Sequence, residues 1–341
     1  MARPRIDPVV WRPDRAPTRA RQGSGGRPMP PVRLRTLPGQ GPEDVAVDSR
    51  GQVYTGLADG RIVLVTTDRA ETVAQTGGRP LGVEVQPDGR LVVCDALRGL
   101  LRVDPVDGRV ETLVAAGTPI DGAPLRLCNN AAVAADGTIF FSDSSQRFDL
   151  AHWKADLLEH SGTGRLLRRD PDGRTGVVCD GLHFANGVAL AADESSVVVA
   201  ETGAYRLVRI RLSGPRAGGV DRLAENLPGF PDNLSRGTDG LLWIALGSPR
   251  NVLLDLLSPR HPALRRMVWA LPERFQPKPA DTVWVQAVDV DGRLVHDLQA
   301  RVPGFSMVTG VREHRGRVWL GSLHGTAVAA FDVPPEGVAT G

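Results

Sequence analysis

Short apolar runs separated by polar turns recur along the chain and predict an all-β protein. The first copy has apolar runs at 45–47, 53–56 and 61–65, followed by a fourth run at 71–74. A polar turn that ends in glycine lies between the first two runs. Four short antiparallel strands joined by such turns are typical of one blade of a β-propeller.

This pattern occurs six times, and glycine occupies the first turn of every copy except one. The aligned turn residues are Gly51, Gly89, Gly137, Glu194, Gly240 and Gly316. Neighbouring turns lie about 38 to 76 residues apart, which corresponds to one blade each with insertions. We therefore expect a six-bladed β-propeller over 38–333, preceded by a Pro- and Arg-rich arm at 1–37 and followed by a C-terminal tail at 334–341.

Two insertions, at 146–163 and 249–275, carry helix-like apolar periodicity. The second is rich in Arg and is broken by Pro259 and Pro262. Long ordered insertions in a rigid scaffold commonly shape a binding site. We expect a short helical lid over one mouth of the propeller channel, with Trp243 adding to its apolar wall. The alternative is an amphipathic helix that faces a membrane.

The net charge of +2 conceals a basic arm, because nine Arg in 1–36 face only Asp7 and Asp14. Prolines interrupt these cations and aromatic residues do not alternate with them, so binding to nucleic acid is not expected. The simpler interpretation is a solvated arm whose Val9, Val10 and Trp11 pack on the outside of the ring.

The cysteines and the apolar runs bear on the compartment. Cys94, Cys128 and Cys179 lack the paired spacing of a metal site, and any disulfide scheme leaves one of them over. The first thirty residues contain no continuous apolar run, and no stretch approaches the ~18–20 apolar residues of a membrane helix. We expect a reduced, cytoplasmic protein without a membrane partner, and the sequence leaves its oligomeric state open.

One position of the repeat carries oxygen ligands in four copies. The residues eight positions before the aligned turns are Glu43, Leu81, Asn129, Asn186, Asp232 and Val308. Equivalent positions in a ring of blades face a common axis, so the two carboxylates and two amides are expected to converge. A single Asn or Asp here would be read as a turn residue that bonds its own backbone, but four in one register favour a metal site.

The chemistry of these four side chains selects the metal. Glu43, Asp232, Asn129 and Asn186 offer only hard oxygen ligands, which suit Ca²⁺, with Mg²⁺ or Mn²⁺ as alternatives. Four ligands leave positions that water or a substrate must fill. The cation can therefore take part in catalysis, or it can simply hold the blades together.

Several segments carry a family resemblance in combination: GPEDVAVD at 41–48, FSDSS at 141–145, FANGVAL at 184–190, AET at 200–202, FPDN at 230–233 and VREH at 311–314. Together they resemble the superfamily of gluconolactonases, senescence marker protein, strictosidine synthase-like proteins and adipocyte plasma membrane-associated protein. The resemblance covers roughly 38–333. It implies a six-bladed propeller, one axial divalent cation and, in many members, hydrolysis of lactones or aryl esters.

The resemblance also implies roles for individual residues. The metal ligands of lactonase members carry over onto Glu43, Asn129, Asn186 and Asp232, and the usual general base matches Asp232. Gluconolactonases typically have Arg two residues before the third-blade Asn and Asp directly after it, whereas Leu127 and Asn130 stand there. This departure disfavours specificity for sugar lactones.

A second catalytic candidate is His183, three residues before Asn186, which could relay a proton from water; the alternative is a channel histidine without chemistry. We predict a metal-dependent hydrolase of lactones or small esters, with Asp232 or His183 as the base. One rival is a strictosidine synthase-like enzyme that forms bonds, disfavoured because 305–310 lack the carboxylate that such enzymes use. The other rival is a propeller with a structural metal that binds a partner without catalysis.

Overall fold

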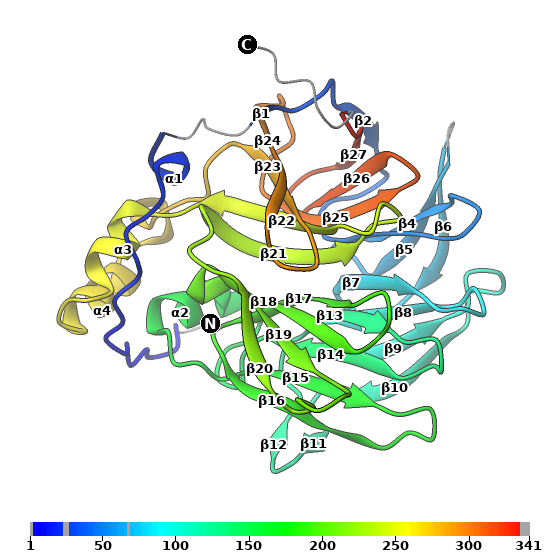
Figure 1. Ribbon diagram of the computed structural model, residues 1–341, viewed down its shortest axis with the longest axis horizontal. Helices are drawn as coiled ribbons and strands as arrows, with labels where there is room; N and C mark the ends of the chain where they lie inside the picture. Colours follow the sequence, from blue (N-terminus) through cyan, green and yellow to red (C-terminus); the bar gives the residue numbers. More distant parts are fainter. Residues whose placement is uncertain (1–2, 23–26, 67–68, 335–341) are drawn as a thin grey trace.

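The computed structural model describes residues 3–22, 27–66 and 69–334 and shows a six-bladed β-propeller (Figure 1). The expected fold class is therefore confirmed. The expected tail at 334–341 lies, from residue 335 onward, outside the described residues. Each aligned turn residue in the chain, including Glu194, has a positive φ, which places it in the left-handed region that glycine favours.

The first three blades follow one another along the chain. Blade 1 contains β3 (Val45–Val47), β4 (Val53–Gly56), β5 (Arg61–Val65) and β6 (Ala70–Gln75). Blade 2 contains β7 (Pro80–Val85), β8 (Leu91–Asp95), β9 (Gly99–Val103) and β10 (Val110–Ala115). A short hairpin of β11 (Pro119–Ile120) and β12 (Ala123–Pro124) leads to blade 3, which contains β13 (Cys128–Val133), β14 (Ile139–Asp143), β15 (Gly164–Arg169) and β16 (Thr175–Leu182).

The remaining blades complete the ring. Blade 4 contains β17 (Ala185–Leu190), β18 (Ser196–Glu201), β19 (Arg206–Arg211) and β20 (Val220–Ala224). Blade 5 contains β21 (Gly229–Arg236), β22 (Leu242–Pro249), β23 (Val283–Val288) and β24 (Leu294–Ala300). Blade 6 contains β25 (Val308–His314), β26 (Arg317–Ser322) and β27 (Ala327–Asp332).

The N-terminal segment closes the ring. Strand β2 (Arg33–Thr36) pairs antiparallel with β27 and forms the fourth strand of blade 6, so the first and last parts of the chain share one sheet. Strand β1 (Arg27–Pro28) adds parallel to β24 at the edge of blade 5. The arm expected at 1–37 therefore supplies two strands to the propeller, and the expected boundary at residue 38 falls just after β2.

Apolar side chains from facing sheets form the core between neighbouring blades. Trp243 and Phe305 are fully buried and pack with Phe331 between blades 5 and 6. Since Trp243 also stacks on His296 in this core, it does not form the pocket wall that we expected of it. Arg165 and Asp143 form a buried ion pair between β15 and β14, with 2.6 Å between Nη2 and Oδ2. Arg165 also donates to the carbonyls of Ile120 and Pro124, which ties the hairpin before blade 3 to that blade.

Both insertions are helical, as the sequence predicts. The first forms a 3-10 turn (Leu150–His152) and α2 (Trp153–Glu159), and the second forms α3 (Val252–Leu257), α4 (Ala263–Ala270) and a 3-10 turn (Glu273–Phe275). A further 3-10 turn (Thr202–Ala204) follows β18. Together these helices form a lid at one side of the ring (Figure 1). No helix in the described ranges is long and apolar enough to cross a membrane.

The N-terminal arm crosses this lid before it reaches α1 (Thr18–Gln22) and the ring (Figure 1). Ile6 is buried against α2 and α4. The guanidinium of the fully buried Arg265 donates to the carbonyls of Leu158 and Val9, which links α4 to α2 and to the arm. Val9 and Val10 themselves are about half exposed. The arm is thus a strap over the lid.

Candidate metal centre and adjoining pocket

The innermost strands of blades 3, 4 and 5 are irregular at the position where the sequence places the ligands. In β13, β17 and β21, the pairing with the next strand skips two residues, which are 129–130, 186–187 and 232–233. A bulge leaves such residues without ladder partners and redirects their side chains. Glu43 and Asp44 hold the corresponding place directly before β3. The four predicted ligands therefore occupy equivalent positions in blades 1, 3, 4 and 5, and those of blades 3, 4 and 5 lie in bulges.

The sixth position is Thr309, and the expected Val308 was wrong by one residue. In blade 6 the skipped residues are 309–310, because Val308 still pairs with Ser322 and Val311 pairs with Leu320. The hairpin that follows has only two residues between its strands, whereas blade 2 has five. Counting back from the turn glycine therefore overshoots. The Thr309 hydroxyl donates to the Glu43 carbonyl at 2.7 Å.

The second bulge residue alternates between a polar side chain and glycine around the ring. In chain order these residues are Asp44, Gly82, Asn130, Gly187, Asn233 and Gly310. Each polar side chain comes from an odd-numbered blade, and a glycine occupies the place in the blade that follows. A Cβ on Gly187 would lie 2.3 Å from the Leu234 nitrogen. The glycines thus allow the inner strands of neighbouring blades to approach closely.

These polar residues form a belt that braces the ligands, which sequence reasoning missed. Asp44 accepts hydrogen bonds from the Val45 and Val83 amides and from the Asn130 side chain, at 2.8, 3.1 and 3.0 Å. Asn130 Oδ1 in turn accepts from the Val188 amide at 2.9 Å. These hydrogen bonds make the Asp44 carboxylate a brace between blades 1, 2 and 3. The sequence feature that could have revealed this brace is Asn130, the residue that departs from the gluconolactonase pattern.

Two predicted ligands present oxygens that lack a protein partner. Asn129 Nδ2 donates to Ser144 Oγ at 2.9 Å, and Asn186 Nδ2 donates to Thr202 Oγ1 at 3.2 Å. These bonds orient both amides, yet Oδ1 of each is buried without a hydrogen-bond partner. Buried polar atoms without a partner are uncommon and call for an explanation. Two such oxygens at equivalent positions fit a bound cation.

The two carboxylates lie near each other. Burial raises the pKa of Glu43 well above its ordinary value, and the charges of Asp232 and Asp44 raise it further. Burial also raises the pKa of Asp232 to about 7, which a hydrogen bond from Asn186 opposes. Asn233 Nδ2 donates to Glu43 Oε2 at 3.0 Å. Paired buried acids of this kind need a nearby positive charge to be ionised together.

The donor set fits a hard divalent cation of the Ca²⁺ type, because it consists of two carboxylates and two amide oxygens. In the described part of the chain, no group of three or more His, Cys, Asp and Glu side chains is placed to bind a metal. This agrees with a site that depends on Asn129 and Asn186 for half of its ligands. A donor set of oxygens alone also disfavours Zn²⁺, which commonly takes nitrogen and sulfur ligands.

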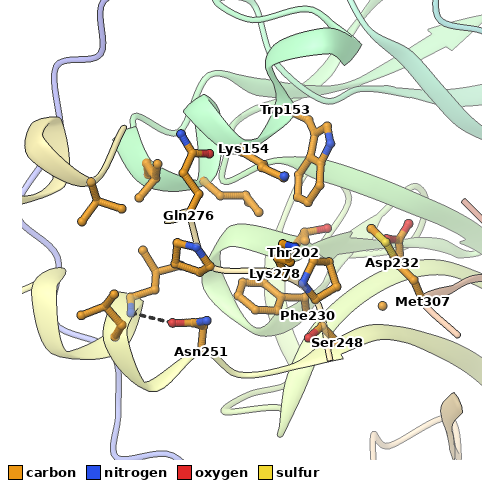
Figure 2. A pocket seen from close by; sticks show the side chains of 18 of the residues that line it. Trp153, Lys154, Thr202, Phe230, Asp232, Ser248, Asn251, Gln276, Lys278 and Met307 are labelled. Atoms are coloured by element: carbon orange, nitrogen blue, oxygen red, sulfur yellow. Dashed lines mark hydrogen bonds between the residues drawn. The ribbon is translucent and has the colours of Figure 1, made fainter. Parts of the chain in front are cut away.

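A pocket connects Asp232 to the lid. Figure 2 shows Asp232 at one end, beside Met307, with Trp153 and Phe230 along the walls. The lid adds apolar side chains from α2, α3 and α4, namely Leu157, Leu158, Leu253, Leu254, Leu257 and Val268. Among its lining residues in the described ranges, Asp232 is the only carboxylate. The expected lid therefore borders the pocket, with Trp153 and Phe230 in the place expected for Trp243.

The structure does not bring His183 to this pocket. Its ring stacks on His160, with 3.9 Å between the centroids, and His160 also stacks on Trp11 of the arm, with 4.0 Å between the centroids. His183 lines a different, polar recess under the arm. Burial lowers the pKa values of both histidines, that of His160 to about 2. The stack of neutral rings joins the arm and α2 to blade 4.

Comparison with known proteins places the chain in a family. Residues 129–215 match the strictosidine synthase family, and 32–65 match the N-terminal region of strictosidine synthase-like proteins. The adipocyte plasma membrane-associated protein of Salmo salar is 34% identical over 318 residues, which span 86% of this chain and 76% of that protein. The chain belongs to the strictosidine synthase-like family. The human adipocyte plasma membrane-associated protein is 35% identical to this family member over 83% of the chain and 73% of its own length.

The chain also shares its fold with solved structures. A gluconolactonase from Xanthomonas campestris aligns with a TM-score of 0.63 at 20% identity, covering 98% of this chain and 99% of that one. Regucalcin, a calcium-binding protein from Agrobacterium tumefaciens, aligns with a TM-score of 0.59 at 13% identity over 88% and 91% of the two chains. These similarities show the shared propeller fold.

Proposed function

We propose that the protein is a divalent-metal-dependent hydrolase of lactones or small esters, with Ca²⁺ as the preferred cation. The observation that carries the proposal is the pair of unpartnered oxygens on Asn129 and Asn186, next to Asp232 at the end of an apolar pocket. The names of two fold neighbours, a gluconolactonase and a calcium-binding protein, support the same chemistry.

The four ligands have distinct tasks. Glu43, Asn129, Asn186 and Asp232 would hold the cation, which when bound supplies positive charge for a carbonyl oxygen and acidifies nearby water. Asn233 holds the Glu43 carboxylate, and Ser144 and Thr202 orient the amides of Asn129 and Asn186. Rigid support of this kind matters because small displacements of catalytic groups cost much of the rate.

Asp232 is the proposed general base. It is the ligand that also lines the pocket, so its carboxylate lies where a substrate carbonyl and an attacking water would meet. With the cation bound, its positive charge would keep this carboxylate ionised and able to accept a proton from water. The apolar walls formed by Trp153, Phe230 and the lid leucines exclude bulk water from this end of the pocket. His183 is proposed to hold the arm and lid rather than to move protons.

Bond formation of the strictosidine synthase type is the weaker alternative. The segment at 305–310 contributes Ser306 and Met307 to an open recess beside the pocket and contains no carboxylate. A non-catalytic propeller with a structural metal is the other alternative. The apolar pocket that reaches Asp232 favours an enzyme, because a purely structural cation does not require access from a binding pocket.

A panel of lactones and aryl esters, assayed with chelator and then with added Ca²⁺, Mn²⁺ or Mg²⁺, tests the proposal. The variant Asp232→Asn at saturating cation should lower turnover by about 10²-fold, as expected for a lost general base. Asp291→Asn is the matched control, since it removes the same charge from an exposed turn of the same blade. Full activity in Asp232→Asn would refute the role of the base.

A further inference from the structure

Lysine is rare in this chain, and both lysines lie at the pocket. Of 41 Lys and Arg residues, only Lys154 and Lys278 are Lys. Lys154 belongs to α2 in the first insertion, whereas Lys278 follows the second insertion. Figure 2 shows both among the side chains that line the pocket with Asp232. All the other Lys or Arg positions of the chain carry Arg, so two lysines at one pocket indicate a local requirement for the ammonium group.

The two lysines border two spaces at once. They line the apolar pocket and also the more open recess beside it, together with Pro279 and Met307. The ammonium groups are thus carried by the wall between an apolar interior and an accessible exterior. Such a wall suits a ligand with an apolar part on one side and a charged part on the other. Lysine fits this role because its flexible stem lies along apolar surface while its compact charge reaches water.

Lys154 pairs with the exposed carboxylate of Glu273, and the charge of Lys278 acts on the same group. Lys154 Nζ lies 3.2 Å from Glu273 Oε1, and the Glu273 side chain is 75% exposed. The hydrogen bond from Lys154 lowers the pKa of Glu273 most, and the charge of Lys278 contributes in the same direction. Exposed ion pairs contribute little because water competes for both partners. An incoming anion can therefore replace Glu273 at Lys154, on the wall that Lys278 shares.

We propose that the substrate is an amphipathic anion. Its apolar chain occupies the pocket beneath the lid, its ester or lactone carbonyl lies at Asp232, and a carboxylate or phosphate group binds between Lys154 and Lys278 in place of Glu273. The identity of the reaction rests on the proposed hydrolase function, whereas recognition of the anion does not.

Calorimetric binding of octanoate and of 1-octanol to the full-length protein tests recognition without any reaction. Octanoate should bind about tenfold more tightly, as two ammonium groups near one anion imply. In Lys154→Gln/Lys278→Gln this preference should fall below about twofold, including in the presence of chelator. Arg260→Gln is the control, because it removes a cation from the lid outside the pocket lining and should keep the preference. Equal affinities in the unmodified protein, or an unchanged preference in the double variant, would overturn the proposal.

Two esters then separate this inference from the hydrolase function. Phenyl octanoate and 4-carboxyphenyl octanoate have the same acyl chain, and only the second carries an anion on its alcohol side. The double lysine variant should raise KM for the anionic ester about tenfold and leave the neutral ester unchanged. If both esters are hydrolysed with equal KM in all variants, the anion site is wrong and the hydrolase stands. If neither ester is hydrolysed while octanoate still binds more tightly than 1-octanol, the hydrolase function is wrong and the anion site stands.

Discussion

Replacing Gly187 by Ala tests whether the close approach of blades 4 and 5 shapes the metal centre. The new Cβ would lie 2.3 Å from the Leu234 nitrogen and 2.7 Å from the Asn233 carbonyl carbon, whereas ordinary Cβ contacts begin at 3.4 Å. The two inner strands must therefore separate by about 1 Å. Because the opposing atoms are backbone, no side chain can move aside. Overpacking typically costs about 1–3 kcal/mol, and we expect the upper end of this range.

The same separation should move Asn186 away from Asp232, so the affinity for Ca²⁺ should fall at least tenfold. Urea unfolding, followed by tryptophan fluorescence, measures the free energy of unfolding, and a Ca²⁺ titration measures the affinity. Gly176→Ala is the matched control, since Gly176 lies in β16 and a Cβ there would meet its nearest atom, Asp121 Oδ2, at 3.6 Å. If Gly187→Ala is as stable as this control and binds Ca²⁺ as tightly, close blade contact does not position the ligands.

Two further predictions concern the lid. Removal of residues 1–15 takes away the backbone hydrogen bonds of Val9 and Trp11 to the lid, which contribute about 1 kcal/mol each. Limited proteolysis within 249–279 should then become about tenfold faster, while the circular dichroism of the propeller is retained. Unchanged cleavage would show that the arm does not hold the lid. Burial raises the pKa of Asp156 to about 7, above its value in the unfolded chain, so its contribution to stability is present at low pH and is lost as pH rises towards 7. The stabilising effect of Asp156→Asn should therefore grow between pH 5 and pH 7 by up to about 1.4 kcal/mol per pH unit and level off above pH 7, whereas a difference that does not vary with pH would contradict this assignment.

The blades could be predicted from sequence because each repeats a local signal. Apolar runs around a left-handed turn recur even where Glu194 replaces glycine, since the apolar strands on either side keep the pattern. Strand β2 could not be predicted in this way. All four of its residues are exposed, so it lacks the alternation that a half-buried strand shows. It is ordered by backbone pairing with β27, a contact between the two ends of the chain that no local pattern encodes.

The candidate ligands could be predicted because the same bulge position recurs in several blades. The error at Val308 came from the turn length of blade 6, which the alignment on Gly316 could not register. The brace of Asp44 and Asn130 was missed because its meaning depends on contacts between blades 1, 3 and 4. His183 lies close to Asn186 in sequence, but it belongs to the bend between β16 and β17 and lines the recess under the arm, not the pocket.

The central claim is that one bound divalent cation enables hydrolysis at Asp232. The most direct test is to titrate Ca²⁺ into chelator-treated protein in a calorimeter and to measure hydrolysis of lactones and aryl esters on the same samples. The account predicts one cation per chain and a rate that rises in proportion to its occupancy. Hydrolysis that persists at full rate without the cation would contradict the account, as would a fully occupied site in a protein that hydrolyses no lactone or ester.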